Sequence, residues 1–234
     1  MSRIIAIPAR YASTRLPGKP LRIIAGKTLI EHVVANAAKC KLADEIVVAT
    51  DDERILDAAR AAGANAVMTG EHCASGTDRI SEALKGREFE HVLNLQGDEP
   101  LVPPGLLDEV FGALTQGAPV ATAARKLRSP DELSDPSRVK VVCDSRGHAL
   151  IFSRAAIPHA RELSESSLAL ETARVHVGVY GFQRKVLESY SSLERPAIEA
   201  VERLEQLRLL HAGYDIKVLE CADFGDSIDT LQRP

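Results

Sequence analysis

The first half of the chain alternates short β-branched runs with amphipathic segments, and this alternation constrains the fold more than any other feature. The runs predict strands at residues 4–9, 45–50, 64–69 and 91–95, and the segments between them predict helices at 27–40, 51–62, 78–85 and 103–114. Parallel strands joined by helical crossovers must bury both faces of their sheet. We therefore expect a parallel sheet covered by helices, with ligand sites at the carboxyl ends of its strands.

Beyond residue 119 the pattern becomes richer in strands, which are expected at 120–127, 139–143, 149–152, 175–182 and 216–220. A single helix is expected over 196–211, with Val201, Leu204 and Leu207 on one face, and the Ser/Glu/Leu-rich connector at 161–171 is expected to be a mobile loop. The chain is thus predicted to be a single α/β domain, 1–234. It would comprise a parallel part, 1–118, and a smaller β-rich part, 119–234, that returns to the main sheet.

Composition narrows the class of protein. The 234 residues are 45% hydrophobic and 26% charged, as in an ordinary globular protein, which excludes a disordered chain. A net charge of −4 and only 4% aromatic residues argue against a nucleic-acid partner, which would need a basic surplus or stacking side chains. No apolar run has the length of a membrane span, so no membrane association is expected. Four widely separated cysteines predict reduced thiols and a cytoplasmic protein.

The loop after the first predicted strand reads P-A-R-Y-A-S-T-R-L-P-G-K-P and carries three cations, Arg10, Arg15 and Lys19, together with Ser13. Arginine makes planar two-point contacts with phosphate and lysine supplies a mobile charge, so this loop can neutralise a polyphosphate. The Walker A pattern is absent. A solvated basic loop is the alternative interpretation, but the position at a strand end favours phosphate binding.

Two acids follow the fourth predicted strand in Q-G-D-E-P, at Asp98 and Glu99. Mg²⁺ in nucleotide sites commonly takes one or two carboxylates plus phosphate oxygens, so Asp98 is a candidate ligand. An ordinary turn is the alternative, since Gly-Asp and Glu-Pro are usual turn residues. A second acid, Asp229 in S-I-D-T, could complete the metal site and would otherwise be an ordinary surface residue.

Other segments are ambiguous when taken alone. Ser75, Gly76 and Arg79 in A-S-G-T-D-R could shape a pocket for a base or could simply begin a helix. His176 lies within a valine-rich strand, where a histidine is usually a hydrogen-bonded structural residue, and Glu205 lies on a helix where a solvated polar stripe is the common outcome. No Ser/His/Asp or Cys/His nucleophilic set is recognisable.

Eight motifs in order carry a family resemblance: I-P-A-R-Y-A-S-T-R-L-P-G-K-P, V-V-A-T-D-D-E-R, S-G-T-D-R-I, Q-G-D-E-P-L-V-P-P, V-K-V-V-C-D, F-S-R-A-A-I-P, H-V-G-V-Y and L-E-Q-L-R. The chain closely resembles the 3-deoxy-manno-octulosonate (Kdo) cytidylyltransferases over nearly its whole length. The resemblance implies the reaction CTP + Kdo → CMP-Kdo + diphosphate in lipopolysaccharide biosynthesis. It also implies Mg²⁺ as cofactor and a homodimer with the nucleotide-diphospho-sugar transferase (glycosyltransferase-A-like) fold and a smaller β-rich sugar-binding and dimerisation lobe.

The resemblance also implies roles for individual residues. The nucleotide would be held by Arg10, Ser13, Arg15, Lys19, Ser75, Gly76, Arg79 and Gln96. The sugar acid would be held by Arg154, Arg161, His176, Tyr180, Glu205 and Gln206. Magnesium would be held by Asp98 and Asp229, and the catalytic residues would be Arg10, Lys19 and Asp98. The attack of the anomeric hydroxyl on the α-phosphorus would then need positioning and charge neutralisation rather than a separate general base.

Alternatives remain open at this stage. Another 2-keto sugar acid, such as the 8-amino analogue of Kdo or sialic acid, would use the same chemistry with a different sugar pocket. An inactive CTP-binding paralogue is a further alternative, because the V-D-T-P-E-D-L segment usual in the family reads S-I-D-T-L-Q-R-P here. That departure affects the surroundings of Asp229 and is expected to bear on the metal site or the dimer contact.

Overall fold

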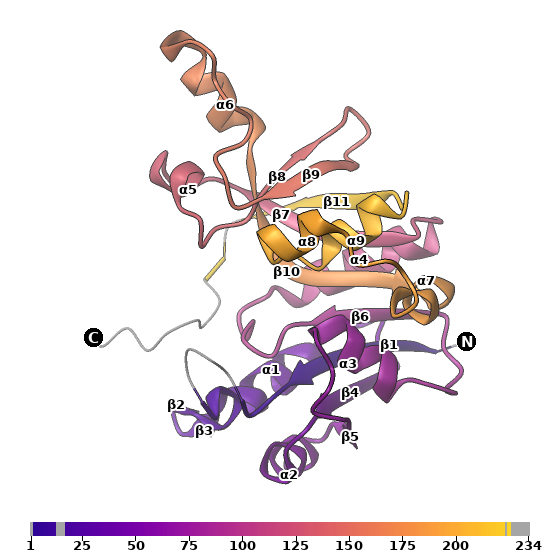
Figure 1. Ribbon diagram of the computed structural model, residues 1–234. Helices are drawn as coiled ribbons and strands as arrows, with labels where there is room; N and C mark the ends of the chain where they lie inside the picture. Colours follow the sequence, from indigo (N-terminus) through magenta and orange to yellow (C-terminus); the bar gives the residue numbers. More distant parts are fainter. Residues whose placement is uncertain (1, 13–16, 223, 226–234) are drawn as a thin grey trace.

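One mixed sheet organises the computed structural model, which describes residues 2–12, 17–222 and 224–225 (Figure 1). Its described strands follow the order β11-β7-β10-β6-β1-β4-β5, with β8 and β9 attached beside β10. Their bounds are β1 Arg3–Ala9, β4 Glu45–Thr50, β5 Asn65–Met68, β6 His91–Leu95, β7 Val120–Lys126, β8 Lys140–Cys143, β9 Ala149–Ser153, β10 Arg174–Gln183 and β11 Ile216–Cys221. A separate short hairpin joins β2 Ile23–Ile24 to β3 Lys27–Thr28.

The parallel part of the sheet is centred on β1. Strand β1 pairs in parallel with β4 on one side and β6 on the other, and β4 pairs in parallel with β5. The chain therefore moves outward from β1 to β5 and returns to the opposite side of β1 at β6, which creates a topological switch point between β1 and β6. This arrangement confirms the mostly parallel α/β sheet predicted from the sequence.

Strand β10 breaks the parallel pattern, because it pairs antiparallel with both β6 and β7. Beyond it, β11 pairs in parallel with β7. In the antiparallel register Val179 lies opposite Leu95, so the first half of β10 runs past the carboxyl end of β6. The division into parts 1–118 and 119–234 remains a prediction, and this pairing joins strands from both into one sheet.

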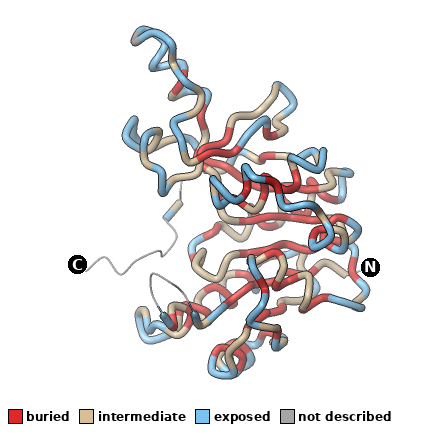
Figure 2. Tube along the Cα trace, in the orientation of Figure 1, coloured by how far each residue is buried: buried red, intermediate tan, exposed pale blue. Residues whose placement is uncertain are grey.

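Two apolar cores fill the two faces of the sheet, and successive residues of β1 alternate between them. Ile5 and Ile7 face one core together with the buried sides of α1, α2 and α4, whereas Ile4 and Ala6 face the other with α3, α7 and α9. The bounds of these helices are α1 Leu29–Ala37, α2 Glu53–Ala61, α3 Gly76–Ala83, α4 Pro104–Thr115, α7 Arg184–Tyr190 and α9 Gln206–His211. The strands are buried along most of their length (Figure 2), as expected of a sheet covered on both faces.

The prediction of one helix over 196–211 was wrong. The segment forms two short helices, α8 Ala197–Glu202 and α9, separated at Arg203 by a left-handed backbone conformation with φ of 54°. Val201 is 83% exposed, whereas Leu204 and Leu207 are buried, so the three residues do not share one face. The local apolar spacing missed this break because the reversal depends on contacts made with the rest of the protein.

The connector at 161–171 also differs from the loop that was predicted. It contains a 3₁₀ turn at Leu163–Glu165 and most of α6 Ser166–Thr172, which projects from the body of the molecule (Figure 1). The alanine, leucine and glutamate residues of this segment have high helix propensity. The prediction of a loop gave more weight to its serines, which are common in loops. The short helix α5 Asp131–Ser134 and the helix α7 were not predicted.

Two further features bear on the sequence-based expectations. None of the described helices is both long enough and apolar enough to cross a membrane. All four cysteines are free thiols, at Cys40, Cys73, Cys143 and Cys221.

Gly181 in β10 provides a test of the packing between the sheet and α4. A Cβ atom at this position would lie 2.7 Å from Val110 Cγ1 and 2.9 Å from Leu114 Cδ1, both on buried side chains of α4. We expect Gly181→Ala to lower the free energy of unfolding by about 1–3 kcal/mol through overpacking. Gly105→Ala is the control, because a Cβ there meets nothing within 4 Å. Equal denaturation midpoints for the two variants would contradict this account of the packing.

Candidate active site

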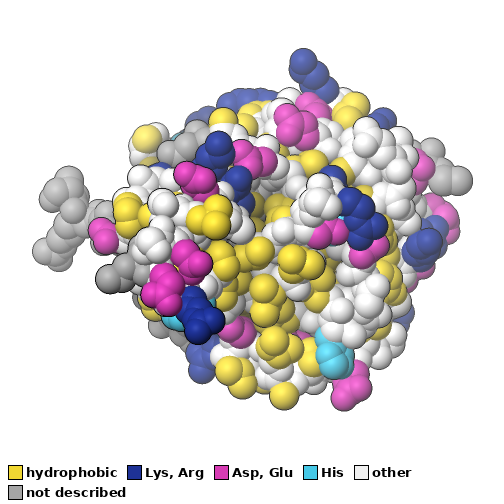
Figure 3. Space-filling view, turned by 90° about the horizontal axis from the view of Figure 1, so that it is seen from above, with side chains coloured by type: hydrophobic (Ala, Val, Ile, Leu, Met, Phe, Trp, Pro, Cys, Tyr) yellow, Lys and Arg dark blue, Asp and Glu magenta, His cyan; other side chains and the backbone are white. Residues whose placement is uncertain are grey.

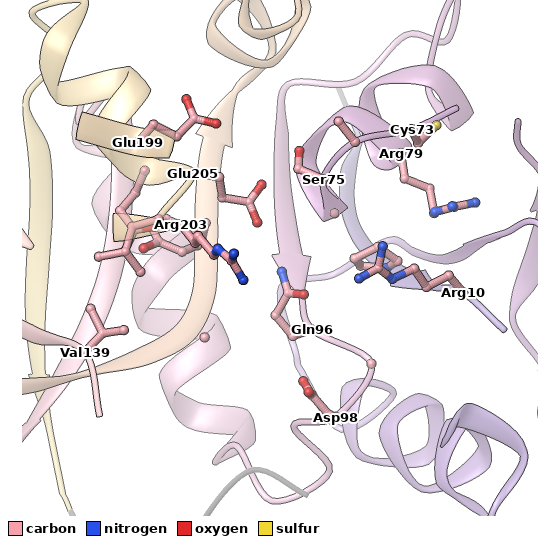
Figure 4. A pocket seen from close by; sticks show the side chains of 18 of the residues that line it. Arg10, Cys73, Ser75, Arg79, Gln96, Asp98, Val139, Glu199, Arg203 and Glu205 are labelled. Atoms are coloured by element: carbon pink, nitrogen blue, oxygen red, sulfur yellow. The ribbon is translucent and has the colours of Figure 1, made fainter. Parts of the chain in front are cut away.

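A cavity of about 900 Å³ opens at the carboxyl ends of β1 and β6, at the switch point of the sheet. One wall comprises the end of β1, the start of α3 and the Gln96–Asp98 turn that follows β6. The opposite wall comprises the first half of β10 and the segment from 195 to 206 (Figure 4). The cavity therefore combines the predicted nucleotide segments with most of the predicted sugar segments.

The loop after β1 contributes two of its predicted cations to the cavity. Arg10 is exposed and lines the cavity, and Lys19 lies at the start of a 3₁₀ turn, Lys19–Leu21. The Lys19 Nζ donates a hydrogen bond to Asp98 Oδ2 at 2.7 Å, which links this loop to the turn after β6. Ser13 and Arg15 lie outside the described residues, so their roles remain predictions.

The start of α3 forms the next part of this wall. The Ser75 hydroxyl caps the helix by accepting a hydrogen bond from the Asp78 amide at 3.0 Å. Gly76 allows a close approach, because a Cβ there would lie 3.1 Å from Pro8 and 3.3 Å from Gln96 Nε2. These contacts hold the helix start against the ends of β1 and β6.

Arg79 lines the cavity but directs two of its nitrogens to protein partners. Its Nη1 donates to Thr69 Oγ1 at 2.6 Å and its Nη2 donates to Asp51 Oδ2 at 2.8 Å. The guanidinium is 3% exposed, and the ion pair with Asp51 compensates for its burial. This geometry gives Arg79 a clear part in holding α3 to the end of β4, while its contact with a base remains a prediction.

Gln96 and Asp98 follow β6 directly. The Gln96 side chain projects into the cavity (Figure 4), and its Nε2 donates to Asn94 Oδ1 at 3.2 Å. The Asp98 carboxylate lines the cavity and is partly exposed, with one oxygen bound by Lys19. It presents hard oxygen donors of the kind that Mg²⁺ takes together with phosphate oxygens, so a divalent cation fits beside it. Asp229 lies outside the described residues.

The opposite wall includes His176 and Tyr180 from β10. The Thr122 hydroxyl donates its hydrogen to the Val179 carbonyl at 2.6 Å and lies 3.0 Å from His176 Nε2. Because a hydroxyl has only one hydrogen, Nε2 is the protonated ring nitrogen and donates to Thr122 Oγ1. Burial lowers the pKa of His176 to about 3, which leaves the ring neutral. Its ring also packs against Phe152 and Tyr180, at centroid distances of 5.3 and 5.0 Å.

The Tyr180 hydroxyl is buried and has no hydrogen-bond partner among the residues that the structure describes. Burial raises its pKa well above the ordinary value, and the nearby Glu205 carboxylate adds to that effect. The hydroxyl therefore stays protonated beside the cavity. A buried hydroxyl without a hydrogen-bond partner costs free energy, so binding of a ligand that accepts a hydrogen bond from Tyr180 would be favoured.

Glu205 and Gln206 lie where the chain turns from α8 into α9, and both line the cavity. Glu205 Oε2 accepts a hydrogen bond from the Thr77 amide at 3.2 Å, so its carboxylate reaches the positive end of α3. Gln206 is buried. The break at Arg203 turns these side chains inward, which excludes the solvated polar stripe considered from the sequence.

The two predicted sugar-binding arginines differ in position. Arg154 lines the cavity, with its Nε donating to the Glu202 carbonyl at 2.8 Å and its Nη1 to the Pro136 carbonyl at 3.0 Å. Arg161 is exposed ahead of α6 and is not among the described residues that line the cavity. Its role in sugar binding remains a prediction.

Sequence reasoning missed Arg195, Glu199 and Arg203 as cavity residues. Arg203 projects its guanidinium into the cavity (Figure 4), and no hydrogen bond or ion pair joins it to another described residue. Arg195 lies 3.1 Å from Glu199, which is itself buried and paired with Arg208. An unbroken helix would have placed Arg203 on the outer surface, so the only available signal was the density of arginines between 195 and 208.

The switch-point cavity, with cations and a carboxylate on one wall and a polar wall opposite, defines an α/β nucleotidyltransferase. Residues 4–216 match the family model described as cytidylyltransferase. The 3-deoxy-manno-octulosonate cytidylyltransferase of Anaeromyxobacter dehalogenans strain 2CP-C is 49% identical over 97% of this chain and 92% of its own length. The chain belongs to the 3-deoxy-manno-octulosonate cytidylyltransferase family, which confirms the resemblance seen in its motifs.

Other comparisons refine this placement. The structure of CMP:2-keto-3-deoxy-manno-octonic acid synthetase complexed with CTP is 41% identical and superposes with a TM-score of 0.91, covering 98% of this chain and 94% of that one. The 8-amino-3,8-dideoxy-manno-octulosonate cytidylyltransferase of Shewanella pealeana is also 41% identical, over 98% of this chain and 94% of its own. A 4-diphosphocytidyl-2C-methyl-D-erythritol synthase from Anaerococcus prevotii, at 18% identity and a TM-score of 0.64, shares the fold.

The half-buried His176, whose pKa is lowered by desolvation, predicts a pH dependence of stability. A histidine in the unfolded chain has a pKa of about 6.5, whereas the pKa of His176 is about 3 in the folded protein. Between these values the unfolded chain binds a proton that the folded protein excludes, so stability falls as the pH falls. This side chain contributes a slope of at most about 1.4 kcal/mol per pH unit.

We therefore expect His176→Gln to flatten the loss of stability from pH 7 to 5, measured by denaturant unfolding. His211→Gln, at an exposed histidine that ends α9, should follow the unmodified protein. Parallel curves for His176→Gln and the unmodified protein would show that the ring is not held neutral by burial.

Proposed function

We propose that this protein transfers the cytidylyl group of CTP to Kdo, giving CMP-Kdo and diphosphate for lipopolysaccharide synthesis. The observation that carries the proposal is the single cavity in which Arg10, Lys19 and Asp98 face His176, Tyr180 and Glu205. A nucleoside triphosphate and a polar sugar acid can therefore meet at the switch point. The name of the Anaeromyxobacter relative and the CTP complex of the synthetase both support this choice of substrates.

The cations after β1 serve the departing diphosphate. In the reaction the anomeric hydroxyl oxygen of Kdo bonds to the α-phosphorus, the bond from that phosphorus to the β-phosphate oxygen breaks, and the hydroxyl proton passes to solvent. Arg10 and Lys19 lie where they neutralise the triphosphate and the negative charge that grows on the leaving group. The two walls supply the remaining requirement, which is to hold the reacting atoms in line.

Mg²⁺ is part of this proposal, with Asp98 as the described carboxylate that would hold it and Asp229 as its predicted partner. When bound, the ion would offset phosphate charge and lower the pKa of the attacking hydroxyl. Lys19 holds Asp98 by a 2.7 Å contact and so fixes the carboxylate at the mouth of the phosphate region. His176 is poorly suited to act as a general base, because its pKa of about 3 makes the ring a weak base and its Nε2 is hydrogen-bonded to Thr122.

Arg203 is assigned in this proposal to the carboxylate of the sugar acid. Arg79, Arg154 and Arg195 also line the cavity, but each already contacts an acid or carbonyl oxygen of the protein. Arg203 has no such contact among the described residues and lies beside Glu205 on the sugar wall. A guanidinium binds a carboxylate through two parallel hydrogen bonds, which suits a 2-keto acid.

The proposal includes a homodimer in the cytoplasm. Large apolar side chains are exposed on β9, α6 and α8: Leu150, Ile151, Leu168, Ile198 and Val201. Figure 3 looks down on this end of the molecule and shows hydrophobic side chains gathered there. A second copy of the chain would cover such a surface. The free thiols of the protein suit a reducing compartment such as the cytoplasm. Sedimentation of the unmodified protein and of Leu150→Glu tests the dimer directly.

A second candidate substrate is the 8-amino analogue of Kdo, favoured by the Shewanella relative. The deciding measurement is diphosphate release from CTP and Mg²⁺ with Kdo, the 8-amino analogue and sialic acid offered separately. Faster diphosphate release with Kdo supports the proposal. Faster release with another acid would show that the enzyme has a different sugar substrate. Silence with all three, in a folded protein that binds CTP, would overturn it in favour of a binding-only role.

Asp98→Asn tests the phosphate end of the cavity. Asparagine keeps the size of the side chain but removes the charge that pairs with Lys19 and would hold Mg²⁺. We expect kcat to fall by about 100-fold or more, as for loss of a central electrostatic group. Asp57→Asn, an exposed acid on α2, should retain full activity. Near-normal turnover by Asp98→Asn would remove this residue from the mechanism.

Arg203→Met tests the sugar end. Loss of a charge-assisted pair costs about 1.5–3 kcal/mol, which corresponds to a rise of roughly 10- to 100-fold in the KM for Kdo. The KM for CTP should change much less, and Arg203→Lys should recover part of the loss. Arg60→Met, at an exposed position of α2, serves as control. An unchanged KM for Kdo in Arg203→Met would show that another group binds the carboxylate.

A further inference from the structure

A cluster of His72, Cys73 and Glu82 lies at the edge of the cavity and has no part in the proposed reaction. The segment between β5 and α3 folds over the Glu82 side chain, which comes from α3. His72 Nε2 lies 3.0 Å from Glu82 Oε2, and Cys73 Sγ donates to the same oxygen at 3.3 Å. The nitrogen, sulfur and oxygen atoms all lie within 4.8 Å of one another.

This geometry is close to that of three ligands on one ion. Zinc holds imidazole nitrogen and carboxylate oxygen at about 2.0–2.2 Å and thiolate sulfur at about 2.3 Å in a tetrahedron. Ligand atoms in such a tetrahedron lie roughly 3–4 Å apart, which matches the contacts of 3.0 and 3.3 Å on Glu82. His72 is mostly exposed and Cys73 is buried, so an ion can enter from the His72 side and keep a fourth position for water.

Gly70 holds the cluster in this arrangement. Its amide donates to Glu82 Oε1 at 2.7 Å, which orients the carboxylate so that the other oxygen faces His72 and Cys73. A Cβ on residue 70 would lie 2.2 Å from His72 Nδ1 and Cε1, so the imidazole can lie against this position only when it is glycine. The backbone at Gly70 thus orients the Glu82 carboxylate, to which the side chains of His72 and Cys73 are both directed.

From this geometry we infer that His72, Cys73 and Glu82 form a binding site for a borderline-soft divalent ion of the zinc class. A thiolate ligand selects such ions over Mg²⁺, which takes oxygen ligands, so this site is chemically separate from the one at Asp98. On binding, the thiol proton passes to solvent and a sulfur–metal bond forms. The ion joins the 70–73 segment to α3, directly before the Ser75–Gly76 segment predicted to contact the nucleotide.

Co²⁺ provides the test, since it replaces zinc and reports a thiolate ligand by a charge-transfer band in the near ultraviolet. Titration of the full chain with Co²⁺ should saturate at one ion per chain, and added Zn²⁺ should abolish the band. Cys73→Ser should lack the band, whereas Cys143→Ser should keep it. No band in the unmodified protein at stoichiometric cobalt, or a band that survives Cys73→Ser, overturns the site.

Two further variants separate the site from a loss of folding. Gly70→Ala removes no ligand but displaces the His72 ring, so it should weaken cobalt binding by at least about 10-fold. Zn²⁺ should also raise the unfolding temperature of the unmodified protein, because an ion that binds only the folded state stabilises it. Glu82→Gln, which keeps an acceptor for the Gly70 amide, should lose that rise. An equal rise in Glu82→Gln and the unmodified protein would contradict the assignment.

Discussion

The antiparallel insertion of β10 between β6 and β7 is the constraint on which the site depends. A fully parallel sheet would present only loops at the carboxyl end of β6. Here the register of Val179 with Leu95 carries the first half of β10 past that end, and the side chains of His176 and Tyr180 form the second wall of the cavity. The change of strand direction thus supplies a second wall, proposed to bind the sugar acid, opposite the loop proposed to bind the nucleotide.

A chain of buried charges joins the two walls. Glu199 binds Arg208 through two contacts, of 2.9 and 2.7 Å, and the Arg208 guanidinium lies 3.7 Å from Asp78 at the start of α3. Glu205 reaches the same helix start through the Thr77 amide. Buried ion pairs add little net stability but are costly to break, so they define how α8 and α9 sit against α3. The segment proposed to bind the sugar acid is therefore held to the segment proposed to face the nucleotide.

The local sequence pattern predicted the structure correctly where neighbouring residues determine the backbone. Strands β1, β4 and β6 fall where β-branched runs predicted them, and Lys19, Gln96 and Asp98 reach the cavity because each follows a strand end. Periodicity failed where distant contacts decide the backbone. The left-handed Arg203 divides the predicted helix and turns Glu205 and Gln206 inward. Contacts with distant parts of the chain stabilise that turn, among them the burial of Leu204, the Glu199–Arg208 pair and the hydrogen bond from the Thr77 amide to Glu205. Placing β10 likewise required knowledge of its partners in the sheet.

The distribution of charge around the cavity separates supporting groups from groups that can meet substrate. The positive charge of Arg79 is compensated by Asp51, and the donors of Arg154 are engaged by two carbonyl oxygens, so both side chains are held in place by the protein. Arg10 and Arg203 project from opposite walls, and neither forms a hydrogen bond or ion pair with another described residue. Two anionic substrates that must approach each other would each meet one of these arginines. The two arginines would offset the repulsion between the two anions. Since neither arginine is already paired with a described residue, neither substrate has to displace an existing ion pair, and binding energy remains for alignment of the reacting atoms.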